Sequence, residues 1–272
     1  MSFTVETYVE RSTATGEKMP LPLHLYRPKG IPGPLPVIVY YQGSAFKKQN
    51  LVENIARHVL FAQRGFIVAV PEYRPSSVAP FPAQCEDFKC AVRYLRSNAE
   101  KFDHDQNRIA AWGDSSGGHT VLMAGFTGDR ELNDDPYQGI SADASCIVDW
   151  YGPIDFSRMN AVPSSQNHFD SDSPEGLEIG GKPIFENLGL VQQASPLTYL
   201  ETGRKVPPTL IMHGSRDCIV PFNQSCLLYE RMRETGQDVT FVRVEGASHG
   251  SLGFHCAKTV DLVESFVREH LA

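Results

Sequence analysis

Six short runs rich in hydrophobic residues occur along the chain, and segments with a different spacing separate them. The run 37–41 consists of β-branched and aromatic residues, a composition typical of a strand that is buried on both faces of a sheet. Each run ends close to a glycine, a proline or a polar turn. The strands that this pattern predicts are 37–41, 66–70, 108–112, 145–151, 209–213 and 239–244.

Between these runs, apolar residues recur every three or four positions, which is the spacing of a helix with one buried face. In the segment 81–98, for example, Phe88, Val92 and Leu95 fall on one side of the predicted helix. Strands that alternate with helices predict right-handed crossovers and a parallel sheet covered on both faces. The predicted helices are 51–63, 81–98, 116–126, 222–235 and a last one that begins near residue 254.

Two extended segments, 3–10 and 21–27, precede the alternating part of the chain and surround a turn. The expected fold is therefore α/β, with a mostly parallel eight-stranded sheet, an antiparallel N-terminal edge and helices on both faces. We expect 1–272 to be a single domain, because a core of this size needs no disulfide or metal. The segment 152–205 breaks the alternation after the sixth strand. Its length and polar composition predict a lid over the carboxyl edge of the sheet.

Composition and charge narrow the range of partners. The chain has 41% hydrophobic and 21% charged residues and a formal net charge of −7. No basic cluster exceeds two residues, which argues against nucleic acid or an anionic membrane as the main partner. No apolar stretch is long enough to span a bilayer and no signal peptide is recognisable, so we expect a cytoplasmic protein. The six cysteines lack the spacing of zinc or redox sites and are expected to be reduced, with a disulfide as the alternative.

The first candidate catalytic motif is the sequence Gly-Asp-Ser-Ser-Gly at 113–117, which lies between a predicted strand and a predicted helix. A strand that turns tightly into a helix is the context of a nucleophile elbow, in which a serine is held in a strained backbone. Ser115 is therefore the candidate nucleophile. The N-terminus of the following helix favours the negative charge that develops on a substrate.

A serine hydroxyl needs a base to become nucleophilic, and the base needs an acid to orient it. Asp217 and His249 follow the predicted strands 209–213 and 239–244, and the chain order is nucleophile, acid, base. Because the carboxyl ends of parallel strands lie at the same edge of a sheet, we expect Ser115, Asp217 and His249 to lie close together.

Other carboxyl and imidazole side chains near these strand ends are alternatives. Asp149 and Asp155 flank the end of the strand 145–151 and are alternative acids, and His255 is an alternative base. His119 lies one turn behind Ser115 in the predicted helix, and His213 ends a strand. We expect both of these histidines to be structural, with His213 beneath the Asp217 loop.

The loop after the strand 37–41 is a second source of candidate site residues. An acyl-transfer site needs amide donors for the oxyanion, and one of them is the amide of the residue after the nucleophile, Ser116. We expect the other from Ser44 or Ala45, in a stretch of small residues. Gln42, Gly43 and Phe46 of the same loop are expected to contact the substrate, with Gly43 shaping the turn.

These motifs together resemble serine esterases of the α/β-hydrolase fold, close to the hormone-sensitive-lipase-like and the bifunctional feruloyl and acetyl-xylan esterase groups. The resemblance covers nearly the whole chain, and it implies Ser115, Asp217 and His249 as the catalytic triad. The landmarks that carry it are 36–40, 65–74, 81–87, 108–119, 151–155 and 213–217.

The chain departs from the His-Gly-Gly-Gly loop that is usual in this family. Gln42 replaces the histidine, and Ser44 and Ala45 replace two of the glycines. The added Cβ atoms disfavour positive φ angles in the loop, so the sequence leaves open which amides point inward. Ser116 stands where alanine is common, and its hydroxyl could fill part of the acyl side of the pocket.

The resemblance implies a carboxylesterase that hydrolyses short-acyl esters through an acyl-enzyme intermediate. Acetyl groups, and also hydroxycinnamoyl groups, on carbohydrates are the substrates it suggests, and it implies neither a metal nor an organic cofactor. A small-molecule ester is the expected partner, and assembly into a homo-oligomer stays open. Two other functions remain as alternatives, an amide hydrolase such as a peptidase or formamidase, and a non-catalytic binding protein on the same fold.

Overall fold

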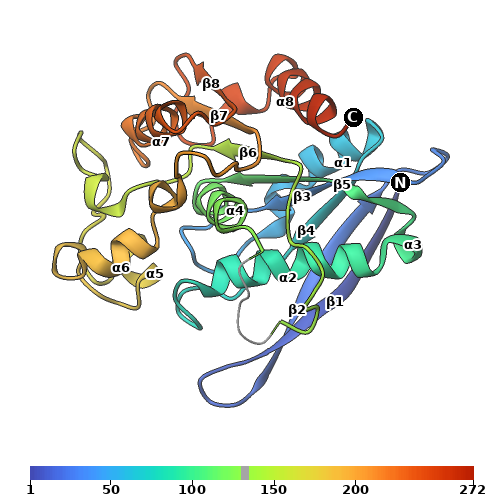
Figure 1. Ribbon diagram of the computed structural model, residues 1–272, viewed down its shortest axis with the longest axis horizontal. Coiled ribbons are helices and arrows are strands. Elements are labelled where there is room, and N and C mark those ends of the chain that lie inside the picture. Colours follow the sequence, from blue (N-terminus) through green and yellow to red (C-terminus); the bar gives the residue numbers. More distant parts are fainter. Residues whose placement is uncertain (130–134) are drawn as a thin grey trace.

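An eight-stranded sheet forms the centre of the protein, with the strand order β1-β2-β4-β3-β5-β6-β7-β8 (Figure 1). The computed structural model describes residues 1–129 and 135–272. The strands are β1 (Ser2–Ser12), β2 (Lys18–Arg27), β3 (Leu35–Tyr41), β4 (Ile67–Pro71), β5 (His104–Asp114), β6 (Cys146–Trp150), β7 (Thr209–Gly214) and β8 (Val239–Val244). Every strand that the hydrophobic runs predict is present, with boundaries that differ by a few residues.

The direction of the strands divides the sheet into two parts. β1 and β2 form an antiparallel hairpin, and β2 also pairs antiparallel with β4. All strand pairs from β4 to β8 are parallel. This confirms the mostly parallel sheet with an antiparallel N-terminal edge. Because the parallel strands share one carboxyl edge, the loops after β3, β5, β7 and β8 all emerge there.

The helices that connect the strands agree with the predicted ones, apart from their ends. The long helices are α1 (Ile55–Gln63), α2 (Ala83–Ser97), α4 (Ser116–Thr127), α7 (Asn223–Glu234) and α8 (Ala257–His270). The predicted helix 51–63 begins with a 3₁₀ turn, η1 (Leu51–Asn54), and a short helix α3 (Ala99–Phe102) was not expected. The last helix begins later than predicted. Phe254 is buried in the core as part of the turn η5 (Leu252–Phe254), ahead of α8.

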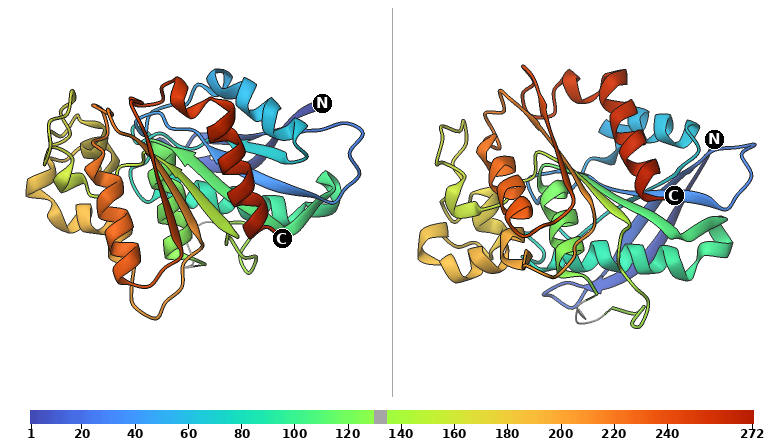
Figure 2. Two further views of the ribbon diagram at one scale, coloured as in Figure 1. Left: turned by 90° about the horizontal axis from the view of Figure 1, so that it is seen from above. Right: turned by 45° about the horizontal axis from the view of Figure 1, so that its top comes forward.

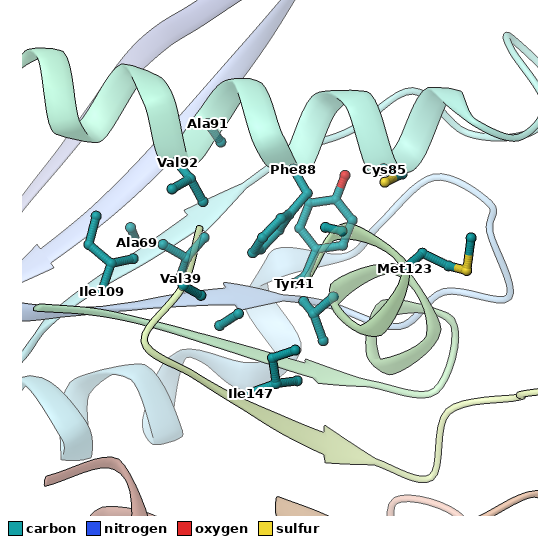
Figure 3. Close-up of a cluster of buried hydrophobic side chains, with 14 of the residues drawn as sticks. Val39, Tyr41, Ala69, Cys85, Phe88, Ala91, Val92, Ile109, Met123 and Ile147 are labelled. Carbon is teal, nitrogen blue, oxygen red and sulfur yellow. The ribbon is translucent and has the colours of Figure 1, made fainter. Parts of the chain in front are cut away.

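Alternate residues of the parallel strands face two separate cores, which is why central strands such as β3 and β4 are hydrophobic throughout. On one face, Val39 and Tyr41 pack under α2, α4 and α7, and Figure 3 shows Phe88 of α2 against this face. On the other face, Ile38 and Tyr40 pack under α1 and α8. The left view of Figure 2 shows α8 lying across this second face.

The segment 152–205 connects β6 to β7 and consists of short helices. They are η2 (Phe156–Arg158), α5 (Pro174–Glu178), η3 (Ile184–Glu186), α6 (Leu188–Gln193) and η4 (Pro196–Tyr199). Its apolar residues form a small cluster of their own, which also includes Phe46 from the loop after β3. Figure 1 shows α5 and α6 at the same end of the sheet as α7. The segment therefore packs against the edge of the sheet where the loops after the parallel strands emerge.

Candidate active site

Ser115 lies at the tip of a tight turn between β5 and α4. Its φ angle is +52°, a left-handed value that is uncommon for a residue with a Cβ atom, and its amide donates to the carbonyl of Trp150 at 2.8 Å. The flanking glycines allow this turn. A Cβ atom on Gly113 would lie 2.2 Å from the carbonyl oxygen of Gly117, and one on Gly117 would lie 2.0 Å from that of Tyr41. The Gly-x-Ser-x-Gly spacing is thus required by the close approach of α4 to β5 and β3.

The side chains of Ser115, His249 and Asp217 form a continuous hydrogen-bonded chain. His249 Nε2 lies 3.0 Å from Ser115 Oγ, and His249 Nδ1 lies 2.7 Å from Asp217 Oδ2. The three residues come from the loops after β5, β8 and β7, which share the carboxyl edge of the sheet. A base that contacts a serine hydroxyl through one nitrogen and a carboxylate through the other has the geometry needed to activate that hydroxyl.

The Asp217 carboxylate is fixed by its own loop. Its Oδ1 accepts from the amides of Ile219 at 2.9 Å and Val220 at 3.0 Å. Burial alone would raise the pKa of this carboxyl, but the hydrogen bonds from His213 and His249 outweigh burial and lower the pKa to about 2. Asp217 is therefore ionised at neutral pH and can accept a hydrogen bond from His249 Nδ1.

His213 supports Asp217 from below, in the structural position expected for it. Its Nε2 lies 2.9 Å from the carbonyl of Val220 and 3.3 Å from Asp217 Oδ2, and its Nδ1 lies 2.7 Å from Ser225 Oγ. A neutral ring that donates from Nε2 and accepts the Ser225 hydroxyl proton at Nδ1 satisfies these contacts. His213 is fully buried, so it holds the Asp217 loop without reaching Ser115.

Tyr151 is a site residue that the sequence analysis did not identify. Its ring centroid lies 4.5 Å from that of His249 and 4.7 Å from that of Phe254. Its φ angle is +46°, and its amide donates to the carbonyl of Met212. The ring packs against the imidazole and limits its rotation. The signal for Tyr151 was its place at the carboxyl end of a strand, next to the strand that leads to Asp217.

The loop after β3, which we call the β3 loop (residues 42–47), lies directly against the Ser115 turn. The amide of Gly43 donates to Asp114 Oδ1 at 2.9 Å, and the amide of Ser44 donates to Ser116 Oγ at 2.9 Å. Ala45 has a φ angle of +55°. A Cβ atom on Gly43 would lie 2.3 Å from the carbonyl oxygen of Asp114, so only glycine fits at this contact.

These contacts decide which amides are free for a ligand. Within residues 1–129 and 135–272, the backbone amides of Ala45 and Ser116 have no acceptor, whereas those of Gly43 and Ser44 are engaged. Of the two loop residues expected as amide donors, the structure thus leaves Ala45 free and not Ser44. The Ser116 hydroxyl is also not in an acyl pocket, because it is buried and accepts the Ser44 amide.

Two other residues of the β3 loop do not point into an open site. The Gln42 side chain is buried, and its Nε2 donates to the carbonyl of Asn50 at 2.8 Å. Phe46 is buried in the cluster with Phe156, and its ring lies edge-on to that of His119 at 5.4 Å. In this structure, Gln42 therefore anchors the loop, and Phe46 joins the loop to the segment 152–205. Neither placement supports the substrate contact expected for them.

The alternative acids have partners of their own. Asp149 is fully buried beneath α4, where burial raises its pKa to about 7 although the Gly152 amide, 3.0 Å from Oδ1, opposes this effect. Asp155 accepts from the amide and the hydroxyl of Ser157, at the start of η2. Neither carboxyl takes the place of Asp217 beside His249.

The other two histidines likewise lie apart from the hydrogen-bonded chain. Nδ1 of His119 lies 2.9 Å from the carbonyl of Pro153, and burial lowers the pKa of this ring to about 4. The His255 ring lies beside Trp150, with 6.3 Å between the ring centroids. His119 thus has the structural place expected for it, and His249 is the imidazole that contacts Ser115.

Three further features of the structure concern metal sites, cysteines and membrane-spanning helices. Among residues 1–129 and 135–272, no group of three or more histidine, cysteine, aspartate or glutamate side chains has an arrangement that could hold a metal ion. All six cysteines are free thiols. In the same part of the chain, no helix combines the length and the apolar character needed to cross a membrane.

Comparison with known proteins gives a consistent result. The model of the BD-FAE family matches residues 23–232, more than half of the chain. Esterase LipC of Mycobacterium tuberculosis is 30% identical over 84% of this chain and 56% of its own length. The chain spans about half the length of the curated relatives that it matches first.

Solved structures resemble the whole chain. A truncated carbohydrate esterase from gut microbiota has a TM-score of 0.82 and 30% identity, over 98% of this chain and 96% of its own. The butyrate-bound form of an esterase from Thermogutta terrifontis has a TM-score of 0.76 and 26% identity, over 98% of this chain and 93% of its own. These matches show the α/β-hydrolase fold that the sequence motifs implied.

Proposed function

Since the chain belongs to the BD-FAE family, we propose that it is a carboxylic ester hydrolase with Ser115 as its nucleophile. The observation that carries this proposal is the chain of hydrogen bonds from Ser115 Oγ to His249 Nε2, and from His249 Nδ1 to Asp217. The same arrangement is the working part of serine hydrolases on unrelated folds, where it is recognised by geometry rather than by sequence position.

The reaction proceeds in two halves. Ser115 Oγ attacks the ester carbonyl carbon while His249 Nε2 takes the hydroxyl proton, and a tetrahedral intermediate with a negatively charged oxygen forms. This intermediate collapses, the C–O bond to the alcohol breaks, and His249 returns the proton to the leaving oxygen. A water molecule, deprotonated by His249, then attacks the acyl-enzyme. The bond from the acyl carbon to Ser115 Oγ breaks, His249 returns the proton to Ser115 Oγ, and the carboxylic acid leaves. Asp217 orients the imidazole throughout and stabilises its positive charge.

The amides of Ala45 and Ser116 stabilise the negative oxygen of the tetrahedral intermediate. Two features support this assignment. Neither amide has an acceptor in the described part of the chain, and Ser116 is the first residue of α4, whose N-terminus carries partial positive charge. Donors that are held in place before the reaction stabilise the developing charge without reorganisation, which commonly supplies the largest part of the rate enhancement.

The substrates are short-acyl esters, with acetyl groups on carbohydrates as the first candidates and hydroxycinnamoyl groups as larger ones. The carbohydrate esterase and the butyrate-bound esterase with the same fold support this choice.

The segment 152–205 acts as a lid within a single domain, 1–272. Its contacts with the loop that carries Asp217 support this role. The amide of Ser165 donates to the carbonyl of Cys218 at 2.7 Å, and His168 Nε2 lies 3.0 Å from the carbonyl of Ile219. The lid thus lies beside the acid of the proposed triad. A cytoplasmic location stays a prediction from the sequence, and assembly into a homo-oligomer stays open.

Hydrolysis of p-nitrophenyl acetate, butyrate and octanoate tests the function. The wild type should cleave acetate and butyrate faster than octanoate, and Ser115→Ala should lower kcat by about 10⁴-fold or more. Ser248→Ala is the matched control, because Ser248 is an exposed serine at the same edge of the sheet, and it should retain wild-type rates. A folded wild type without turnover above that of Ser115→Ala would rule out the esterase.

A further inference from the structure

A buried arginine lies behind the Ser115 turn, on the side of the sheet that faces α1 and α8. Arg57 of α1 is only 7% exposed. Its guanidinium carbon lies 4.6 Å from the ring centroid of Tyr40, 5.3 Å from that of Trp112 and 4.9 Å from that of Trp150. Burying a charge is costly unless it is compensated, so a cation enclosed by three aromatic rings needs an explanation beyond packing.

The arginine is connected to the active site through one tyrosine. Arg57 Nη2 donates to the hydroxyl oxygen of Tyr40, and Asn54 Nδ2 approaches the same oxygen at 3.4 Å. Since both neighbours are donors, the Tyr40 proton is directed to the remaining partner, Asp114 Oδ1. Arg57 Nε and Nη1 have no acceptor within the described residues, so the bond to Tyr40 is the side-chain hydrogen bond through which this cation acts.

Asp114 is the point at which this connection reaches the reacting groups. It immediately precedes Ser115, and its Oδ1 also accepts from the Gly43 amide at 2.9 Å. One carboxylate oxygen therefore joins the Ser115 turn to the β3 loop, which carries the Ala45 amide two residues later. The carboxylate is a negative charge beside the site where a second negative charge develops during the reaction, and Arg57 is the cation that offsets it.

We infer that Arg57 and Tyr40 are positioning residues of this hydrolase. They act through Asp114 to hold the β3 loop against the Ser115 turn and to balance the Asp114 charge. The inference rests on the proposed function, because the Ala45 and Ser116 amides matter only if an oxyanion forms. A misplacement of about 1 Å in such a site costs on the order of 100-fold in rate, so loss of the connection should lower kcat while substrate binding stays nearly unchanged.

A purely structural role for these residues would give a different result. Tyr40 packs in the core between the sheet and α1, and loss of its hydroxyl could simply lower the melting temperature. Tyr26 is a suitable control, since it is a buried tyrosine in the same core and its hydroxyl makes no side-chain hydrogen bond in the described part of the chain. Tyr26→Phe removes a hydroxyl from a tyrosine of the same core without touching Asp114.

The test compares Tyr40→Phe, Tyr26→Phe, Arg57→Met and Arg57→Lys with the wild type and Ser115→Ala. Burst titration with a p-nitrophenyl ester gives the concentration of folded sites, so that kcat is calculated per competent molecule. We expect Tyr40→Phe and Arg57→Met to lower kcat by about 10- to 100-fold with KM within about threefold, Tyr26→Phe to be unchanged, and Arg57→Lys to recover part of the loss.

Each other outcome has a definite meaning. A wild-type kcat in Tyr40→Phe, or an equal loss in Tyr26→Phe, overturns the positioning role while the esterase stands. Equal kcat values for Arg57→Lys and Arg57→Met would show that the positive charge of Arg57 does not contribute to the rate. If the wild type itself shows no turnover that depends on Ser115, the proposed function fails and the positioning role fails with it.

Discussion

Two neighbouring turns at the carboxyl edge of the sheet reach left-handed backbone conformations by different means. At the Ser115 turn, φ is +52° and the flanking Gly113 and Gly117 permit close contacts that no side chain could tolerate. In the β3 loop, Ala45 and Phe46 have φ angles of +55° and +58°, although neither is a glycine. Such values cost on the order of 1–3 kcal/mol per residue, and surrounding contacts must hold them.

Those contacts come from other parts of the chain. The β3 loop is held by the Asp114 carboxylate, the Ser116 hydroxyl and the Tyr73 hydroxyl. The glycines that permit the Ser115 turn thus lie within two positions of Ser115, although Gly117 meets Tyr41 of β3, whereas the left-handed residues of the β3 loop have no such glycines and the loop is held by tertiary hydrogen bonds. The two turns should therefore respond to different substitutions.

The largest effect should follow from a change within the Ser115 turn. In Gly117→Ala, the new Cβ would lie 2.0 Å from the backbone oxygen of Tyr41, which cannot move without shifting β3. We expect kcat/KM to fall by about 10³-fold or more, with a lower melting temperature. Gly189→Ala in α6 is the control, because nothing lies within 4 Å of its added Cβ and it should stabilise the helix by about 0.5–1 kcal/mol. Equal activity of the two variants would contradict the close packing of the turn.

A second effect depends on pH and concerns the contribution of Asp149, which is buried beneath α4, to the stability of the fold. Burial raises the pKa of Asp149 from its ordinary value of 3.8 to about 7. The folded state therefore holds this proton more tightly than the unfolded chain. The resulting stabilisation is fully present below about pH 4 and is lost as the pH rises through about 7. In Asp149→Asn this dependence is absent.

Denaturant unfolding of Asp149→Asn and the wild type at a series of pH values measures this effect. The free energy of unfolding of the variant, minus that of the wild type, should increase by about 4 kcal/mol between pH 4 and pH 8. Parallel profiles for the two proteins would show that Asp149 does not titrate in this range. Asp155→Asn is the control, because the Asp155 carboxyl is partly exposed and lies shortly after the end of β6.

The smallest effect should come from loosening the β3 loop. The Tyr73 hydroxyl donates to the carbonyl of Gln42 at 2.8 Å and lies 2.8 Å from Ser44 Oγ. Tyr73→Phe should lower kcat by about 10-fold, because the loop amides lose part of their support. Its stacking partner provides the control. Tyr41→Phe also loses a buried hydroxyl bond, to the carbonyl of Gln84, and should lose about 1 kcal/mol of stability without loss of kcat.

A kcat for Tyr73→Phe equal to that of Tyr41→Phe, measured on p-nitrophenyl acetate, would contradict the tertiary support of the β3 loop. It would place the determinants of the Ala45 conformation within the loop itself. The two turns would then not differ in the way that their left-handed conformations are held.

The difference between the Ser115 turn and the β3 loop also explains which features could be predicted from the sequence. Hydrophobic runs predicted the six strands from β3 to β8, most clearly β3 and β4, because residues buried on both faces leave a continuous apolar pattern. The Ser115 turn was predictable because the glycines that permit it, Gly113 and Gly117, lie close to Ser115 in the sequence. That the Ala45 amide is free while the Ser44 amide is engaged was not predictable, since the partner of the Ser44 amide is Ser116 Oγ, which lies 72 residues away in the chain.

Other site features were hidden for related reasons. Tyr151 contacts His249 through the relative placement of two loops, and a tyrosine after a strand has no distinctive spacing. The segment 152–205 lacks periodicity because its short helices bury only a few side chains each. Arg57 resembled an ordinary helix cation, and only its enclosure by Tyr40, Trp112 and Trp150 distinguishes it.

Covalent labelling is the most direct test of Ser115 as the activated nucleophile. The folded protein is incubated with a fluorophosphonate, and the adducts are determined by intact mass and peptide mapping. We expect a single adduct on Ser115, which forms fast in the wild type and is absent in Ser115→Ala. A folded wild type that takes up no adduct, or takes it up on another residue, would contradict Ser115 as the activated nucleophile.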